Sequence, residues 1–139
     1  MAGRSDKELL EGLLALESRL VSAYEAALRR DAVDRSLGEE ILGHEREHVA
    51  ALDKTLGSGA ARDPRATVPS PELTAALRSR AAFAGFAERL EARAVTAYAE
   101  AAASIRDARL RQPLGSIMAC EAAHRVALRD LMGERPLVP

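Results

Sequence analysis

Apolar residues recur at spacings of three and four along most of this chain, which is the repeat of an amphipathic α-helix. Stretches rich in glycine, proline, serine or aspartate interrupt the pattern at 31–34, 57–71 and 104–107. Alanine, leucine, arginine and glutamate dominate the rest, and these residues favour helices over strands. We therefore predict an all-α protein with four helices, at about 5–30, 34–57, 71–104 and 108–133.

Residues typical of helix ends flank these stretches. Serine before an early glutamate or a proline is typical of a helix start, and glycine is typical of a helix end. The chain has these signals at Ser5 with Glu8, Ser70 with Pro71, Gly57 and Gly133. Pro113 does not fit a helix interior, so we expect it either to kink the last helix or to lie near its start.

The strongest signal in the sequence is an internal repeat. Residues 16–28 match residues 90–102 at seven of thirteen positions, and residues 41–57 match residues 117–133 at six of seventeen. The shift is 74 residues in the first pair and 76 in the second. A helical hairpin is therefore duplicated, and a pseudo-twofold axis should relate the two halves.

The segment between the halves is long enough to cross a helical bundle. A helix of about 24 residues is about 36 Å long, and about 14 extended residues reach about 46 Å. We therefore predict a single domain over residues 1–139, in which two antiparallel hairpins, at about 5–57 and 71–133, are joined by a long crossover loop at 58–70.

Each predicted helix carries one glutamate in the middle of its apolar face. These glutamates are Glu17, Glu45, Glu91 and Glu121. The apolar residues around them are Leu10, Leu13, Val21 and Leu28; Ile41, Val49, Leu52 and Leu56; Leu73, Leu77, Ala84 and Val95; and Leu114, Ile117, Leu128 and Met132. A buried carboxylate is costly unless it is paired. Only Arg80 and Arg125 lie near these faces, and two arginines cannot neutralise four carboxylates.

Two divalent metal ions would balance this charge. Glu45 precedes His48 by three residues and Glu121 precedes His124 by three, so each pair lies on one helix face. Four ionised glutamates and two neutral histidines against two divalent ions sum to zero. Carboxylate and imidazole ligands together favour iron or manganese over calcium, and a ligand set without cysteine argues against a structural zinc site.

Charge and composition exclude several other classes of protein. Lys and Arg number 20 and Asp and Glu number 21, a net charge of −1, whereas a nucleic-acid binder normally has a basic excess. The single cysteine, Cys120, excludes an intrachain disulfide and any site built on cysteine pairs. The sequence contains no run of about 18 apolar residues, the length needed to span a membrane. The polar first residues are unlike a signal peptide. We expect a cytoplasmic protein.

With these motifs the chain resembles the ferritin-like superfamily, and within it the bacterioferritin and rubrerythrin branch and small bacterial ferritin-like domain proteins. HEREH at 44–48 is similar to the Glu-x-x-His helix of rubrerythrins. A tyrosine seven residues after the first-helix glutamate recurs in that branch, as it does here in Glu17 with Tyr24 and Glu91 with Tyr98. The resemblance covers about residues 8–133 and implies a ferritin-like four-helix bundle that holds two metal ions.

The resemblance also implies roles for these residues. The metal ligands would be the terminal glutamates Glu17 and Glu91, the bridging glutamates Glu45 and Glu121, and one histidine for each ion, His48 and His124. Tyr24 and Tyr98 would donate hydrogen bonds to the ligand carboxylates. The implied cofactor is two iron ions, with manganese as the alternative, and the implied chemistry is ferroxidase activity or the reduction of O₂ or peroxide. Arg46 stands where bacterioferritins have a haem-ligating methionine, so no haem is expected.

Other functions stay open at this stage. The chain could bind or deliver iron without turnover, act as an oxygenase on an organic substrate beside an apolar pocket, or be a metal-free structural bundle. Enzyme activity is therefore a hypothesis, as is a homodimer. Phe83, Phe86 and Leu90 form a second apolar stripe, which is either the edge of the core or a dimer surface.

Several polar residues near the motif have two interpretations. His44 and Cys120 hold equivalent positions in the repeat, one turn before His48 and His124, and they either touch the site or fill packing positions. Three further acids are either extra ligands or parts of solvated helix faces: Glu25, Glu47 and Glu100.

Overall fold

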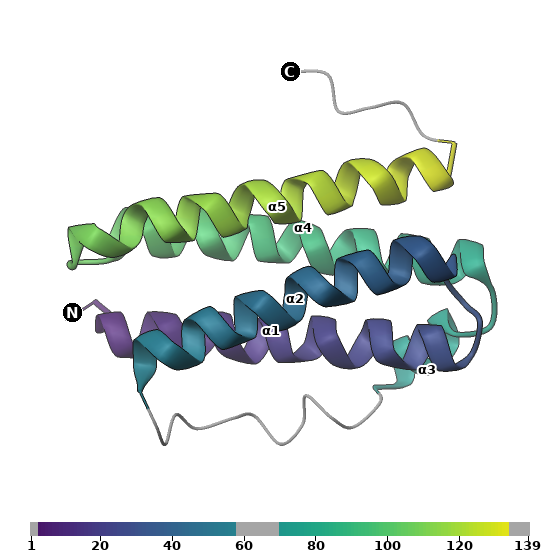
Figure 1. The fold of residues 1–139 in the computed structure, drawn as a ribbon, viewed down its shortest axis with the longest axis horizontal. Coiled ribbons are helices and arrows are strands. Elements are labelled where there is room, and N and C mark those ends of the chain that lie inside the picture. Colours follow the sequence, from purple (N-terminus) through teal and green to yellow (C-terminus); the bar gives the residue numbers. More distant parts are fainter. Residues whose placement is uncertain (1–2, 58–69, 134–139) are drawn as a thin grey trace.

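The computed structural model describes residues 3–57 and 70–133, and the regular secondary structure within them is helical. The elements are α1 (Asp6–Arg29), α2 (Arg35–Leu56), α3 (Pro71–Ala76), α4 (Arg80–Ser104), the 3₁₀ turn η2 (Ala108–Leu110) and α5 (Arg111–Leu131). Figure 1 shows the four long helices as two antiparallel hairpins, α1 with α2 and α4 with α5, lying along one common axis. The all-α bundle predicted from the sequence is confirmed. The crossover predicted at 58–70 lies outside the described residues except for Ser70.

The predicted helix caps are present. Ser5 Oγ accepts a hydrogen bond from the Glu8 backbone N–H at 3.2 Å, and Glu8 Oε2 accepts one from the Ser5 N–H at 2.7 Å. Ser70 caps α3 by accepting a hydrogen bond from the Leu73 backbone N–H at 3.1 Å. Gly57 and Gly133, which follow α2 and α5, have φ angles of 82° and 68°, in the region that favours glycine.

The prediction of one helix over 71–104 is wrong, because the chain breaks between α3 and α4. The Ser79 side chain accepts a hydrogen bond from the Ala82 backbone N–H at 3.0 Å and starts α4 there. The short α3 is held by packing against α4, which buries Leu73 and Ala76. A serine that bonds to nearby backbone competes with helix continuation, and here Ser79 begins α4 after α3 has ended at Ala76.

Pro113 lies in the first turn of α5, which begins at Arg111. The backbone nitrogens of a first turn have no partner within the helix, so proline is tolerated there and need not kink the helix. The preceding residues of the predicted helix form η2 instead. The Asp6 carboxylate of α1 accepts hydrogen bonds from the N–H groups of Arg106 and Asp107, both at 2.9 Å, and so ties the α4–α5 connection to the start of α1.

The core lies between the two hairpins, which meet mainly along α1 and α4, whereas α2 and α5 have few contacts with each other. Each predicted apolar position is buried or partly buried. Phe83 and Leu90 are buried and Phe86 is partly buried, so this stripe belongs to the core rather than to an open dimer surface. The ring of Phe83 meets Tyr24 edge-on, with centroids 5.5 Å apart. Within the described residues, no helix combines the length and apolarity needed to cross a membrane.

Candidate metal centre

Six buried side chains from all four long helices meet in the middle of the bundle. We call them the carboxylate–histidine cluster: Glu17 from α1, Glu45 and His48 from α2, Glu91 from α4, and Glu121 and His124 from α5. The four glutamates are 0% exposed, and the two histidines 8% and 5%. They form two overlapping groups whose ligand atoms lie within 4.8 Å of one another, and Glu45 and Glu121 belong to both groups.

The first group surrounds one nitrogen of His48. Its Nδ1 lies 3.1 Å from Glu45 Oε2 and 3.0 Å from Glu121 Oε1. Glu17 Oε1 is slightly farther away, at 3.6 Å. The Tyr98 hydroxyl donates a hydrogen bond to Glu17 Oε1 from the opposite hairpin. The three-residue spacing of Glu45 and His48 aims both side chains at one point.

The second group mirrors the first, as the internal repeat requires. His124 Nδ1 lies 3.1 Å from Glu45 Oε1 and 3.1 Å from Glu121 Oε2. Glu91 Oε1 lies 3.4 Å from the same nitrogen, and it accepts a hydrogen bond from the Tyr24 hydroxyl at 2.8 Å. Each tyrosine therefore bonds to the glutamate of the other repeat.

Each of the four glutamates keeps one oxygen that accepts no hydrogen bond from the described residues. These atoms are Glu17 Oε2, Glu45 Oε1, Glu91 Oε2 and Glu121 Oε1. Two of them lie near a histidine nitrogen, but not in hydrogen-bonding geometry. Buried carboxylate oxygens without a partner are costly. Four such atoms beside two imidazole nitrogens form a donor set that suits divalent iron or manganese.

The terminal and shared glutamates have opposite electrostatic environments. Burial raises the pKa of Glu17 to about 9, despite the nearby His48 ring, and burial also raises the pKa of Glu91. Burial acts in the same direction on Glu45 and Glu121, but the close contacts of each with both histidines outweigh it and lower the pKa of each. Without metal, the shared pair is therefore ionised and the terminal pair is protonated.

The two histidines balance the charge of the ionised glutamates in the metal-free cluster. Burial alone would lower the pKa of His124, but the nearby carboxylates of Glu121, Glu45 and Glu91 raise it to about 12. The same competition raises the pKa of His48 above its usual range. Two imidazolium ions then face two carboxylates, so the metal-free cluster is neutral. Two divalent ions could replace the protons without changing this net charge.

The other acids and arginines considered from the sequence lie elsewhere. Glu25 forms an ion pair with Arg46 at 3.0 Å, whereas Glu47 and Glu100 are exposed. Arg80 pairs with Asp31. None of these acids belongs to the groups of ligand atoms found among the described residues.

Glu88 is a buried acid that the sequence analysis missed. It lies on α4 and accepts a hydrogen bond from Arg125 Nε at 2.8 Å, with Arg125 Nη2 at 2.7 Å from the same oxygen. Arg125, one of the two arginines near the predicted apolar faces, therefore pairs with Glu88 and not with the cluster. Glu88 therefore has an ordinary ion pair, unlike the four glutamates at the centre.

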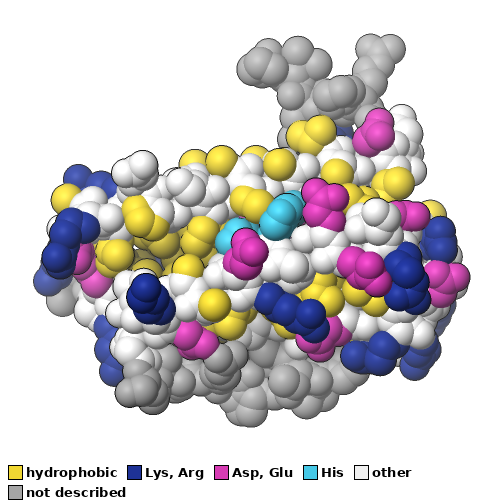
Figure 2. All heavy atoms as spheres, in the orientation of Figure 1, with side chains coloured by type: hydrophobic (Ala, Val, Ile, Leu, Met, Phe, Trp, Pro, Cys, Tyr) yellow, Lys and Arg dark blue, Asp and Glu magenta, His cyan; other side chains and the backbone are white. Residues whose placement is uncertain are grey.

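His44 and Cys120, which the sequence left between a site role and packing, both touch His124. His44 Nδ1 lies 3.0 Å and Cys120 Sγ 3.5 Å from His124 Nε2. Histidine side chains reach the surface in the seam between α2 and α5, in the middle of the face shown in Figure 2. The signal in the sequence was the position of both residues one turn before a motif histidine.

Comparison with known proteins gives one match. The sequence model of the ferritin-like domain family matches residues 5–134. No curated protein and no solved structure matches the chain.

Proposed function

The chain belongs to the ferritin-like domain family, and from this premise we propose that it holds a dinuclear metal centre with ferroxidase or O₂- or peroxide-reducing activity. The two ions, iron or alternatively manganese, would share Glu45 and Glu121. Each ion would also have its own glutamate and histidine, Glu17 with His48 and Glu91 with His124.

One observation carries the proposal: each of the four glutamates has a buried oxygen without a hydrogen-bond donor among the described residues. Together with His48 and His124, the four glutamates fall into two groups that share Glu45 and Glu121. This is the arrangement of a bridged metal pair. A structural bundle would gain nothing from four buried carboxyl groups in one place, because each costs several kcal/mol. The donor chemistry therefore fits two divalent ions.

The bound pair would supply the redox chemistry, because two Fe²⁺ ions can each give up one electron and together reduce peroxide or begin to reduce O₂. The protein's part is to hold the pair and control access. Its carboxylates neutralise the ions, and Tyr98 and Tyr24 orient Glu17 and Glu91 through their hydroxyls. The seam between α2 and α5 is where O₂ or peroxide would approach.

Oxygen consumption distinguishes this function from iron binding or delivery without turnover. Metal-free protein loaded anaerobically with two equivalents of Fe²⁺ and then mixed with O₂ or peroxide should oxidise its iron at least about tenfold faster than the Glu45→Gln/Glu121→Gln variant under the same conditions. An oxygen electrode and the appearance of ferric absorbance measure this. Equal rates in the two proteins would leave iron delivery as the function.

An oxygenase acting on an organic substrate has less support. Two surface hollows, of about 340 and 620 Å³, are lined by residues that include none of the six in the cluster. Neither could present an organic substrate to the centre. We propose O₂ or peroxide as the substrate.

The tyrosines give a test that keeps the ligands intact. Tyr98→Phe removes the hydroxyl that bonds to Glu17, and we expect it to weaken binding of one of the two ions by about 10–100-fold, as for other partners of metal ligands. Tyr24→Phe should do the same for the ion held by Glu91. Titration with Mn²⁺, followed by electron paramagnetic resonance, would show one tight and one weakened site. Two unchanged sites would mean that the tyrosines only pack.

A cytoplasmic location, a homodimer and the absence of haem stay predictions from the sequence.

A further inference from the structure

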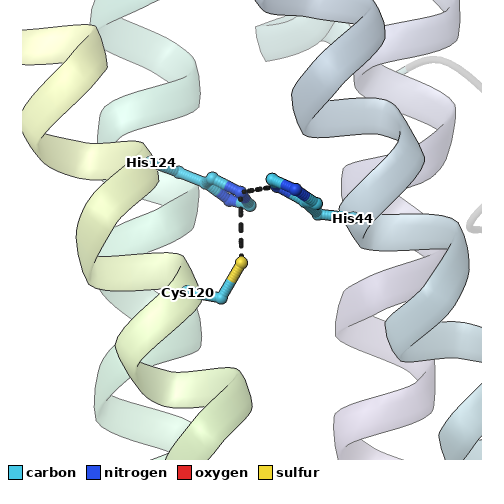
Figure 3. Close-up of side chains that lie close together, drawn as sticks. All are labelled: His44, Cys120 and His124. Atoms are coloured by element: carbon cyan, nitrogen blue, oxygen red, sulfur yellow. Dashed lines mark hydrogen bonds between the residues drawn. The ribbon is translucent and has the colours of Figure 1, made fainter.

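His124 presents its two ring nitrogens to different surroundings. Nδ1 faces the buried carboxylates, 3.1 Å from both Glu45 Oε1 and Glu121 Oε2. Nε2 points outward, to His44 Nδ1 at 3.0 Å and Cys120 Sγ at 3.5 Å. Figure 3 shows His44 reaching from α2, and Cys120 and His124 from α5, across the seam between these helices. We call these three residues the outer trio.

The outer trio comes close to the spacing of ligands on one ion. A tetrahedral ion with metal–nitrogen distances of about 2.0–2.1 Å and a metal–sulfur distance of about 2.3 Å holds its ligand atoms about 3.3–3.6 Å apart. Cys120 Sγ lies 3.5 Å from His124 Nε2, within this range, and all three ligand atoms lie within 4.8 Å of one another. His44 Nδ1 lies 3.0 Å from His124 Nε2, at hydrogen-bond distance, so the two rings must turn and separate by a few tenths of an ångström to hold an ion between them.

The donor set and its exposure specify the kind of ion. Two imidazoles and one thiolate suit borderline ions such as Zn²⁺, Co²⁺ or Fe²⁺ better than Mn²⁺ or Ca²⁺. Three protein ligands leave a fourth position for water. His44 and Cys120 are only partly buried, so an ion can reach them from solvent, whereas the carboxylates behind His124 are fully buried.

We infer that His44, Cys120 and His124 Nε2 form a third metal site, which accepts a borderline transition-metal ion from solution and passes it to the centre behind His124. This inference rests on the proposed dinuclear centre for the destination of the ion. When the ion binds, the Cys120 thiol and Nε2 of the charged His124 ring each lose one proton to solvent, so that a thiolate and a neutral imidazole hold the ion. No oxidant or reductant takes part in the transfer.

The shared ring makes the outer site and the inner position behind it mutually exclusive. A neutral imidazole keeps one proton, which lies on Nδ1 when Nε2 holds an ion. That proton then faces the carboxylates of Glu45 and Glu121. When the ion moves to Nδ1, the proton must lie on Nε2, where His44 Nδ1 accepts its hydrogen bond at 3.0 Å. His124 can therefore serve one ion at a time.

Among the described residues, this arrangement is found in one half of the bundle. The contacts found for His48 among the described residues all use its Nδ1. The position equivalent to His44 in the second repeat is Cys120, so one partner from each repeat converges on His124. The outer site therefore serves the inner position of Glu91 and His124.

Cobalt absorption tests the outer site, because a thiolate bound to Co²⁺ gives a charge-transfer band in the near ultraviolet and carboxylates do not. In the Glu45→Gln/Glu121→Gln variant the inner centre is disabled, and we expect one Co²⁺ per chain with this band. Adding Cys120→Ser should remove the band and weaken Co²⁺ binding at least about tenfold. Glu47→Gln, an exposed change on α2, is the matched control and should keep the band. Circular dichroism checks that each variant is folded.

In the wild type, stopped-flow mixing with Co²⁺ should show the band rise and then decline as ions move inward. No band in the folded double variant would overturn the outer site. A band that keeps its full height in loaded wild type would overturn the shared use of His124, and a band never seen in wild type would overturn the transfer. If the proposed function itself is wrong, the wild type instead binds a single Co²⁺ with the same stable band as the double variant.

Discussion

Replacing both shared glutamates with glutamine will abolish Mn²⁺ binding, which in the wild type should be about two ions per chain. Glu45 and Glu121 belong to both groups of ligand atoms, so their loss leaves each ion with one glutamate and one histidine. Glutamine keeps the shape of the side chain but not its charge. Mn²⁺ is the appropriate probe because it binds thiolate poorly and will not report on the outer trio. Equilibrium dialysis with elemental analysis measures the stoichiometry.

Glu88→Gln is the matched control for this experiment. It also changes a buried glutamate of the bundle, but that glutamate pairs with Arg125 outside the centre. This variant should still bind two Mn²⁺. Without metal, the Glu45→Gln/Glu121→Gln variant should remain folded at pH 8, where histidines relieved of their carboxylate partners are neutral. Retention of two tightly bound Mn²⁺ by the double variant would contradict the bridged centre.

Much of the fold follows from local signals. Ser5 with Glu8 and Ser70 with Pro71 start helices where expected, because caps depend on a few neighbouring residues. The break before Ser79 was missed, since a single serine within an apolar pattern is compatible with a continuous helix. What decides the break is the packing of α3 on α4, a tertiary contact that spacing along one helix does not contain.

The candidate site, like the fold, could be predicted from the sequence only in part. The three-residue spacing of Glu121 and His124 fixes their common face on one helix, and the repeat supplies the equivalent pair. The outward contact between His44 and His124, at 3.0 Å, depends on how α2 and α5 are rotated and separated across their seam. No periodicity within either helix specifies that relation, so the sequence could only name His44 and Cys120 as neighbours of the motif.

Loading the metal-free chain with two divalent ions at pH 7 should release about four protons. The raised pKa values keep Glu17 and Glu91 protonated and keep His48 and His124 charged. As ligands, both carboxyl groups must ionise and both imidazoles must be neutral, so two protons leave from each kind of residue. Calorimetric titration with Mn²⁺ in buffers of different ionisation enthalpy measures the number. Glu88→Gln should release as many protons as the wild type.

These protons also determine how the affinity for metal and the free energy of unfolding change with pH. The apparent affinity for the ion pair should rise steeply from pH 6.5 to about 9, where Glu17 begins to lose its proton without metal.

In the unfolded chain, glutamate releases its proton near 4.5 and histidine near 6.5. The folded metal-free chain therefore binds more protons than the unfolded chain between pH 6.5 and 9, so its free energy of unfolding should fall as the pH rises. Urea unfolding at pH 6.5 and 8.5 without metal measures this fall. Two results together would contradict this account: almost no proton release when Mn²⁺ binds, and a free energy of unfolding that does not change from pH 6.5 to 8.5. They would mean that the glutamates are already ionised and the histidines already neutral before metal binds.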